Sequence, residues 1–336
     1  QIAKGDQSMK LGVVGTSSIS DSFLKASKHI EDIEFDSVMS PRQTNVDRFI
    51  EKYGFRCGYV SYNKFIMNSD IDLVYIASPN IYHFEQTKQA LLQHKNVICE
   101  KPITLSLDDL EELERIADAN DVFFIEAMRP VHHPHIKIIR ESIKKLGLIR
   151  YVSLGFMRYS SKYKEYQKGG NPRVFSKEYG GGALNDLGVY PITLAVLLFG
   201  PPKKVTSNSM SLNTEVDLIT RITMQYDTFI VNCVFSKISN SFVSNEIQGE
   251  CRSLLLSHVT HLDRLELIGN RMSKVLFNER LEDDMRFEIE AISSMVLTKD
   301  VIKFKEFLNI AKDVTTICDT IRSQINGEQI KPLQIL

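Results

Sequence analysis

Short β-branched runs alternate with amphipathic stretches along the first 127 residues. Each run has the length of a buried strand, and each stretch between runs repeats its apolar residues at helical spacing. Strands that alternate with helices of about 10–15 residues predict βαβ units and an α/β fold with a doubly wound parallel sheet. The predicted strands are residues 11–14, 35–39, 72–77, 96–99 and 122–125, and the predicted helices start at residue 19 and span 45–53, 84–94 and 107–120.

The pattern changes in the second half of the chain. After a predicted helix over 136–145, β-rich segments follow one another with short polar turns, which predicts an antiparallel sheet with one covered face. We expect a first domain over 9–127 and an α+β second domain over 128–336, whose last helices could pack back on the first. The predicted strands are 149–157, 203–209, 218–225, 228–235, 241–248, 264–268 and 274–277, and the helices are 185–199, 284–297 and 301–323.

Composition limits the classes of protein to consider. The chain has 336 residues, of which 43% are hydrophobic and 25% charged, the balance of a folded globular protein. A net charge of −1 gives no electrostatic footprint for nucleic acid or an anionic membrane, and the longest apolar run, 192–199, is too short to span a bilayer. Five scattered cysteines without a CxxC pair favour a reducing cytoplasm over a disulfide framework. Residues 1–8 lack periodicity and are expected to be a tag or a disordered extension.

The turn after the first predicted strand has features of a dinucleotide site. Gly15 begins a tight turn into a helix whose first N–H groups could bind pyrophosphate. Compared with G-x-G-x-x-G, only Gly15 is kept, and serines occupy the other glycine positions, 17 and 20. Because serine is also an ordinary helix N-cap, a purely structural turn explains this segment equally well.

The end of the second predicted strand bears on the choice of cofactor. An NAD site has a carboxylate there for the ribose 2′-hydroxyl, whereas an NADP site has arginine or a hydroxyl. Asp36 lies inside the strand, while Ser40 and Arg42 follow its end. These residues modestly favour NADP(H), with NAD(H) as the alternative, and a solvated turn with an incidental arginine fits as well.

Two further segments carry reactive side chains. Lys101 follows a predicted strand at the edge where open α/β sheets bind ligands, and its ammonium could hold a substrate oxygen. Taken alone, a surface lysine is the simpler interpretation. After three glycines, Asp186 and Tyr190 stand four residues apart and would share one face of a helix.

Together these segments resemble the glucose–fructose oxidoreductase/inositol dehydrogenase/rhizopine-catabolism (Gfo/Idh/MocA) family, over essentially the whole chain after Met9. The resemblance implies an N-terminal Rossmann domain and a C-terminal domain with a large, mostly antiparallel open sheet. That sheet often forms a dimer interface in the family, so a homodimer or homotetramer is expected. The segments that carry the resemblance are Val14 to Ile19, Ala77-Ser78-Pro79-Asn80 with His83, Glu100-Lys101-Pro102, Glu126-Ala127-Met128-Arg129 and Gly181 to Tyr190.

The resemblance also implies a reaction, which is reversible hydride transfer between a nicotinamide cofactor and a carbinol carbon of a sugar, polyol or cyclic diol. Lys101 corresponds to the lysine of the family's EKP motif and Asp186 to the aspartate of its glycine-rich helix. Many members have histidine where Tyr190 stands, and tyrosine there is similar to the glucose–fructose oxidoreductase and dimeric dihydrodiol dehydrogenase branch. Tyrosine has a pKa of about 10, so a nearby Lys101 ammonium would have to lower it. In the predicted mechanism Tyr190 exchanges the hydroxyl proton, Lys101 stabilises the alkoxide, and Asp186 orients Lys101 or the substrate.

Contacts to ligands follow from the same resemblance. Ser17 replaces the family's middle glycine and could weaken cofactor binding, and Pro41 stands where NADP-using relatives often have arginine. The substrate residues are expected to be Lys101, Asp186, Tyr190 and Arg158, although a solvated edge explains Arg158 as well. Expected cofactor contacts are Gly15, Thr16, Ser17, Ser18, Ile19, Ser40, Arg42, Ser78, Pro79, Asn80, His83, Glu100, Lys101 and Arg129.

Some alternatives stay open. No metal is expected, because the run of histidines at 132, 133 and 135 has no accompanying carboxylate or cysteine pattern. The main alternative to an enzyme is a catalytically silent NADP(H)-binding sensor or scaffold protein. A third hypothesis is a structural interaction protein. The fold does not identify the substrate, since pocket shape decides it.

Overall fold

The chain folds into two compact units in a computed structural model that describes residues 8–30, 33–68, 70–211 and 216–327. The first unit comprises Gln1–Thr104, Asp108–Ala127 and Asp283–Leu308, and the second comprises Leu105–Leu107, Met128–Glu282 and Asn309–Leu336. The late segment Asp283–Leu308 thus belongs to the first unit. Of the expected tag or extension over 1–8, only Ser8 lies within the described residues.

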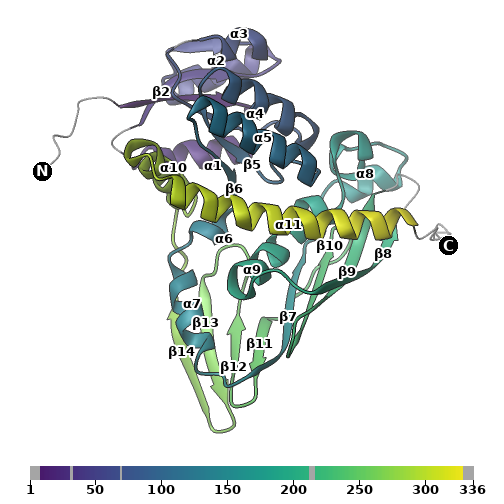
Figure 1. Ribbon diagram of the computed structural model, residues 1–336. Coiled ribbons are helices and arrows are strands. Elements are labelled where there is room, and N and C mark those ends of the chain that lie inside the picture. The colour runs from purple at the N-terminus through teal and green to yellow at the C-terminus, as the bar shows by residue number, and fades with distance from the viewer. Residues whose placement is uncertain (1–7, 31–32, 69, 212–215, 328–336) are drawn as a thin grey trace, which may run out of the picture. The chain divides into compact units, whose positions relative to one another are not determined.

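The first unit is built on a six-stranded parallel sheet with the order β3-β2-β1-β4-β5-β6 (Figure 1). The order reverses direction between β1 and β4, which is the switch point where open α/β sheets bind ligands. The predicted doubly wound parallel sheet is therefore confirmed. Its strands are β1 Met9–Val14, β2 Ile33–Met39, β3 Cys57–Tyr59, β4 Leu73–Ile76, β5 Asn96–Glu100 and β6 Phe124–Ala127.

Helices cover this sheet. The helix α10 contacts α1 and the strands β5 and β6, and the first turns of α11 add Phe304, whose ring packs edge-on against Phe123 and Phe124. The last helices thus contribute directly to the apolar core of the first unit. The helices are α1 Ser18–Ser27, α2 Gln43–Tyr53, α3 Tyr62–Ile66, α4 His83–Leu92, α5 Leu107–Asn120, α10 Arg286–Thr298 and α11 Val301–Gly327, with the short turn η1 Asn80–Tyr82.

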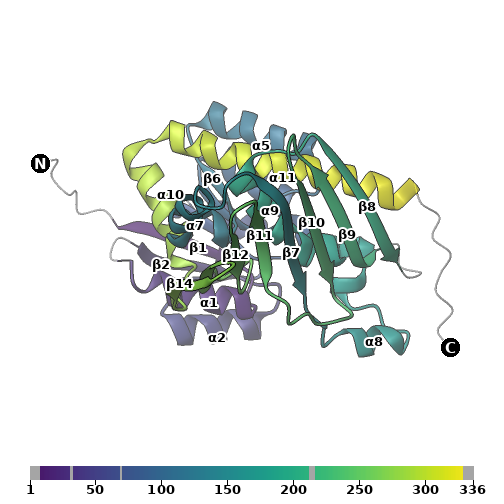
Figure 2. The ribbon, with the colours of Figure 1, turned by 90° about the horizontal axis from the view of Figure 1, so that it is seen from below.

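The second unit contains an eight-stranded sheet with the order β14-β13-β12-β11-β7-β10-β9-β8, seen from below in Figure 2. All neighbours run antiparallel except β7 and β10, which are parallel. This confirms the prediction of a large, mostly antiparallel sheet. The strands are β7 Ile149–Met157, β8 Lys204–Ser211, β9 Asp217–Gln225, β10 Ile230–Ser236, β11 Asn245–Gly249, β12 Ser253–Leu256, β13 Arg264–Gly269 and β14 Met272–Asn278.

One face of this sheet carries the core of the second unit. Alternate residues of β10, Val231, Cys233 and Phe235, are fully buried and pack in one cluster with the apolar helix α9. Segment 177–199 is long and apolar enough to cross a membrane, but 78% of its most apolar window is buried, as expected of a core helix. The remaining helical segments of the unit are α6 Arg129–His132, α7 His135–Ile143, α8 Tyr163–Gln167, η2 Arg173–Phe175, η3 Lys177–Tyr179, η4 Leu184–Gly188 and α9 Val189–Phe199.

The helix predicted over 185–199 is confirmed, but its first turn is of π type and not α-helical. Residues of η4 form a wide π-type turn, and the regular helix α9 begins only at Val189. Such wide turns recur at functional sites, and this one contains Asp186.

Candidate functional site

The turn between β1 and α1 requires glycine at its first position. Gly15 has a φ of +101°, and a Cβ there would lie 2.5 Å from the carbonyl oxygen of Ala77. Its N–H donates to the Met39 carbonyl at 2.9 Å. The turn is therefore held against the ends of both β2 and β4, at the switch point of the sheet.

Hydroxyl groups from two strand ends meet beside this turn. Thr16 Oγ1 donates to Ser40 Oγ at 3.2 Å, and Arg48 Nη2, from α2, donates to the Thr16 carbonyl at 3.1 Å. Ser17 is exposed at the N-terminus of α1 and makes no side-chain capping bond. Sequence reasoning missed Arg48, because it lies six residues beyond Arg42 and reaches the turn only through the packing of α2.

Asp36 is engaged elsewhere, as its position inside β2 suggested. Its side chain is fully buried, and its Oδ1 accepts a hydrogen bond from Arg56 Nε at 2.7 Å. Its Oδ2 accepts one from Asn68 Nδ2 at 3.0 Å. The Asp36 carboxylate is therefore held inside the first unit by Arg56 and Asn68.

The loops after β4 and β5 are tied together by His83. Its Nδ1 lies 2.8 Å from the Pro102 carbonyl oxygen, and its Nε2 lies 2.8 Å from that of Ser78. Burial lowers the pKa of His83, and the hydrogen bonds to the Pro102 and Ser78 carbonyls oppose that shift. His83 therefore links the two loops by hydrogen bonds within the protein. A direct contact between His83 and the cofactor stays a prediction.

Lys101 emerges at the carboxyl end of β5, and the peptide bond to the following proline is cis. Two carboxyl groups belong to the same strand ends. Glu100 Oε1 accepts a hydrogen bond from the Tyr75 hydroxyl at 2.7 Å, and Glu126 Oε1, from β6, accepts one from the Ile103 N–H at 3.0 Å. Burial raises the pKa of Glu126, and the charge of Lys101 opposes that rise. Glu126 is a second residue that sequence reasoning gave no role in the site.

The turn η4 of the second unit is capped by a buried carboxylate, Asp217. Its Oδ2 accepts hydrogen bonds from the Leu184 N–H at 2.9 Å and from Thr220 Oγ1 at 2.7 Å. Gly182 has a φ of +110°, and a Cβ there would lie 2.5 Å from Asp217 Oδ1. Burial raises the pKa of Asp217. Because Gly182 has no side chain, the backbone before Asp186 can pass close to Asp217, the acid that caps η4.

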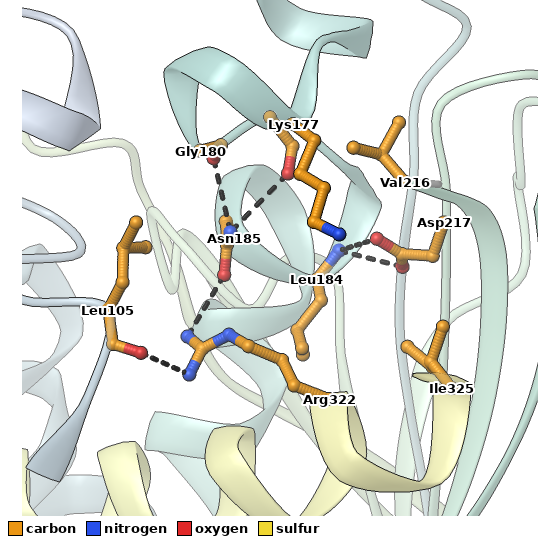
Figure 3. A pocket seen from close by; sticks show the side chains of 10 residues that line it. Leu105, Lys177, Gly180, Leu184, Asn185, Val216, Asp217, Arg322 and Ile325 are labelled. Carbon is orange, nitrogen blue, oxygen red and sulfur yellow. Dashed lines mark hydrogen bonds between the residues drawn. The ribbon is translucent and has the colours of Figure 1, made fainter. Parts of the chain in front are cut away.

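Asn185 ties the same turn to the C-terminal helix (Figure 3). Its Nδ2 donates to the Gly180 carbonyl at 3.1 Å, and its Oδ1 accepts from Arg322 Nη2 at 3.1 Å. Arg322 Nη1 in turn donates to the Leu105 carbonyl at 2.7 Å. A pocket of about 160 Å³ lies beside Asn185, with Lys177 among its other lining residues.

Asp186 forms an ion pair with Lys237, which follows β10 directly. Lys237 is a third residue absent from the predicted site. Tyr190, in the first turn of α9, packs its ring edge-on against Phe156 at a centroid distance of 5.7 Å. Arg158 is exposed, and its N–H donates to the Ser236 carbonyl at 2.9 Å, so its backbone runs beside the end of β10.

The predicted site residues fall into two groups. The residues from Gly15 to Lys101 belong to the first unit, and Arg129, Arg158, Asp186 and Tyr190 belong to the second. The structure brings Thr16 and Ser40 together within the first unit. Within the second, the run from 184 to 190 carries both Asp186 and Tyr190.

The histidine-rich segment is bonded to protein groups. His135 Nδ1 lies 2.9 Å from the Leu262 carbonyl oxygen, and its Nε2 lies 3.4 Å from Glu279 Oε1. Among the described residues, no three His, Cys, Asp or Glu side chains are grouped so that they could hold a metal ion.

Comparison with known proteins gives the same assignment for both halves of the chain. Residues 9–127 match the family model "Oxidoreductase family, NAD-binding Rossmann fold", and residues 138–254 match "GFO/IDH/MocA C-terminal domain". The chain is 33% identical to scyllo-inositol 2-dehydrogenase (NADP(+)) IolU of Bacillus subtilis over 77% of this chain and 79% of that protein. It is 25% identical to trans-1,2-dihydrobenzene-1,2-diol dehydrogenase of Danio rerio, over 65% of each.

A solved structure shares the fold over nearly the full length. The 3-ketoreductase KijD10 from Actinomadura kijaniata, crystallised with NADP and TDP-benzene, superposes with a TM-score of 0.86 at 21% identity, covering 95% of this chain and 98% of that one. The family models match residues in both units, and the relatives described above are named as two dehydrogenases and a reductase. The chain belongs to the Gfo/Idh/MocA family of NAD(P)-dependent oxidoreductases.

Proposed function

We propose that the protein catalyses reversible hydride transfer between NADP(H) and a carbinol carbon of a sugar, polyol or cyclic diol. The observation that carries the cofactor preference is the arrangement at the ends of β1 and β2. Asp36 is engaged by Arg56, whereas Thr16 and Ser40 hydroxyls and the Arg48 guanidinium meet beside the turn. Hydroxyls and guanidinium groups bind a phosphate, while a ribose 2′-hydroxyl calls for a carboxylate.

The residues of the first turn fit a dinucleotide. Gly15 provides the tight turn, and the exposed residues Ser17 and Ser18 begin a ten-residue helix whose N–H groups favour anions. Arg42 is exposed at the start of α2, and we propose that Arg42 and Ser40 bind the 2′-phosphate of NADP(H). NAD(H) remains the weaker alternative.

The catalytic roles follow from the chemistry of three side chains. Bound nicotinamide supplies or accepts the hydride at its C4 position. Tyr190 takes or returns the proton of the substrate hydroxyl, since proton transfer by a positioned side chain is a frequent contribution to catalysis. Lys101 stabilises the negative charge that develops on the same oxygen, and Asp186 orients the reacting groups.

The substrate class rests on the relatives. The matching proteins are named for scyllo-inositol, a cyclic diol and a keto sugar, which share a ring with adjacent oxygen functions. We therefore propose a ring-shaped polyol or sugar as substrate. We also propose that the protein forms a homodimer or homotetramer through the eight-stranded sheet. Its proposed location is the cytoplasm. All five cysteines are free, which suits that compartment.

The proposal is tested first on binding and then on turnover. Calorimetry with NADPH and NADH should show tighter binding of NADPH, and Arg42→Ala should weaken NADPH binding by about tenfold while leaving NADH unchanged. Absorbance at 340 nm is then followed with scyllo-inositol, aldoses and cyclic diols. We expect turnover with at least one of them, and a loss of roughly 100-fold or more in Tyr190→Phe at unchanged NADPH affinity.

Two outcomes would contradict the proposal. Tight NADPH binding without turnover of any compound would favour a silent sensor. Absence of nucleotide binding would favour an interaction protein that kept only the fold.

A further inference from the structure

Lys237 lies on the covered face of the second unit's sheet. Along β10, Val231, Cys233 and Phe235 are fully buried, and the two-residue repeat of a strand places the next inward position at 237. A lysine therefore stands where the pattern calls for an apolar residue. Its side chain is only 6% exposed.

The backbone around Lys237 is fixed on both sides. Its N–H donates to the Leu218 carbonyl at 2.8 Å, and its own carbonyl accepts from the Ser160 N–H at 2.8 Å. Lys237 is thus held between β9 and the segment that follows β7. Its ammonium group can vary in position only through its side-chain torsions.

The turn η4 lies directly over this strand because Gly188 has no side chain. A Cβ at Gly188 would lie 2.7 Å from two ring atoms of Phe235. This close approach brings Asp186, two residues earlier, within reach of the Lys237 ammonium, and Asp186 Oδ2 accepts its hydrogen bond. The ion pair therefore has one buried member, Lys237, and one partly exposed member, since the Asp186 side chain is 40% exposed.

A buried ammonium is unfavourable unless an opposite charge compensates it. In this structure Asp186 provides that charge, and Lys237 in turn holds the carboxylate in one orientation. We propose that Lys237 is a positioning residue of the active site. It holds the Asp186 carboxylate from the buried side, while the exposed part of that carboxylate faces the reacting groups. The inference rests on the proposed function, because it gives Asp186 a task in hydride transfer.

The test is a double-mutant cycle in kcat at saturating cofactor and substrate. Lys237→Met should lower kcat roughly 10- to 100-fold, since a displacement of about 1 Å in a catalytic group can cost that much. In an Asp186→Asn background the same substitution should cost less than about twofold, because Lys237 acts only through Asp186. Lys237→Arg should keep kcat within about threefold of wild type.

A matched control removes another buried ammonium. Lys95 is 8% exposed and directly precedes β5, so Lys95→Met should alter thermal stability without changing kcat. NADPH affinity is measured for every variant and should not change. If Lys237→Met does not fold, Lys237→Gln, which keeps an amide donor, takes its place in the cycle.

The inference is overturned if Lys237→Met keeps kcat within twofold of wild type. It is equally overturned if the substitution costs as much in the Asp186→Asn background as in wild type. Failure of the proposed function is a separate result, since it appears in the wild-type enzyme as lack of turnover.

Discussion

The close contact between Gly188 and Phe235 gives a quantitative prediction for Gly188→Ala. An added Cβ would lie 2.7 Å from Cε2 and Cζ of the Phe235 ring, whereas carbon contacts are favourable at about 3.5–4.0 Å. The ring is fully buried, so the overlap of roughly 1 Å must be relieved by moving η4 away from β10.

The energy follows from two opposing effects. Overpacking a filled core costs about 1–3 kcal/mol, while alanine gains up to about 1 kcal/mol over glycine at helical backbone angles, which Gly188 has (φ −64°, ψ −32°). The net loss is about 1–2 kcal/mol, which lowers the Tm by roughly 2–8 °C in a unit of this size. Because the shift separates Asp186 from Lys237, kcat should fall roughly 10- to 100-fold.

Thermal unfolding and steady-state kinetics check this prediction, with a compensating variant. Phe235→Leu removes the clashing ring atoms, so Gly188→Ala should cost less stability in that background than alone. Gly269→Ala serves as control, because its Cβ would meet its nearest atom at 3.4 Å, an ordinary contact. Additive losses of stability in the double variant, or full activity of Gly188→Ala, would refute the argument.

Two further predictions concern buried carboxyl groups. Asp217→Ala leaves the Leu184 N–H and the Thr220 hydroxyl without their acceptor, so it should cost about 2–4 kcal/mol in urea unfolding, whereas Asp217→Asn should cost less than half as much. Burial raises the pKa of Glu126 above its ordinary value of 4.5, so ionisation of this group opposes folding as the pH rises above that value. Relative to wild type, Glu126→Gln should therefore gain stability as the pH increases from 4.5 to 8 in calorimetric scans, and a difference independent of pH would contradict this.

Most elements of the fold were predictable because their patterns are local. The strand β7 and the helix α5 have the predicted bounds, since each is set by a continuous repeat and a clear stop. The strands β3 and β12 were missed, because β3 has only three residues and β12 consists of a serine and three leucines, without the β-branched residues that marked the other short strands. The parallel pairing of β7 with β10 depends on contacts between residues about eighty positions apart, which no local pattern records.

The site was predictable where a motif carries the chemistry. Lys101, Asp186 and Tyr190 stand in segments whose order and spacing match a family, and the family assignment is confirmed by both matching models. Their roles in the reaction stay predictions. Arg48, Glu126 and Lys237 were given no role, because their contacts depend on the fold. Arg48 reaches the turn after β1 from α2, the Glu126 carboxyl group feels the charge of Lys101 from the neighbouring strand end, and Lys237 meets Asp186 on the face of the sheet where η4 packs.

The signal for Lys237 is structural. Val231, Cys233 and Phe235 are buried at every second position of β10, and continuing this alternation places a charged side chain, Lys237, at an inward position. An inward lysine must find an opposite charge, and the acid on a wide turn packed against the same face is the group that meets it. A charged residue at a buried strand position can therefore indicate a candidate supporting residue of a site, whereas motifs indicate candidates for the residues that react. The Asp186–Lys237 pair is thus a hypothesis that combines both kinds of signal, the motif for Asp186 and the burial pattern of β10 for Lys237.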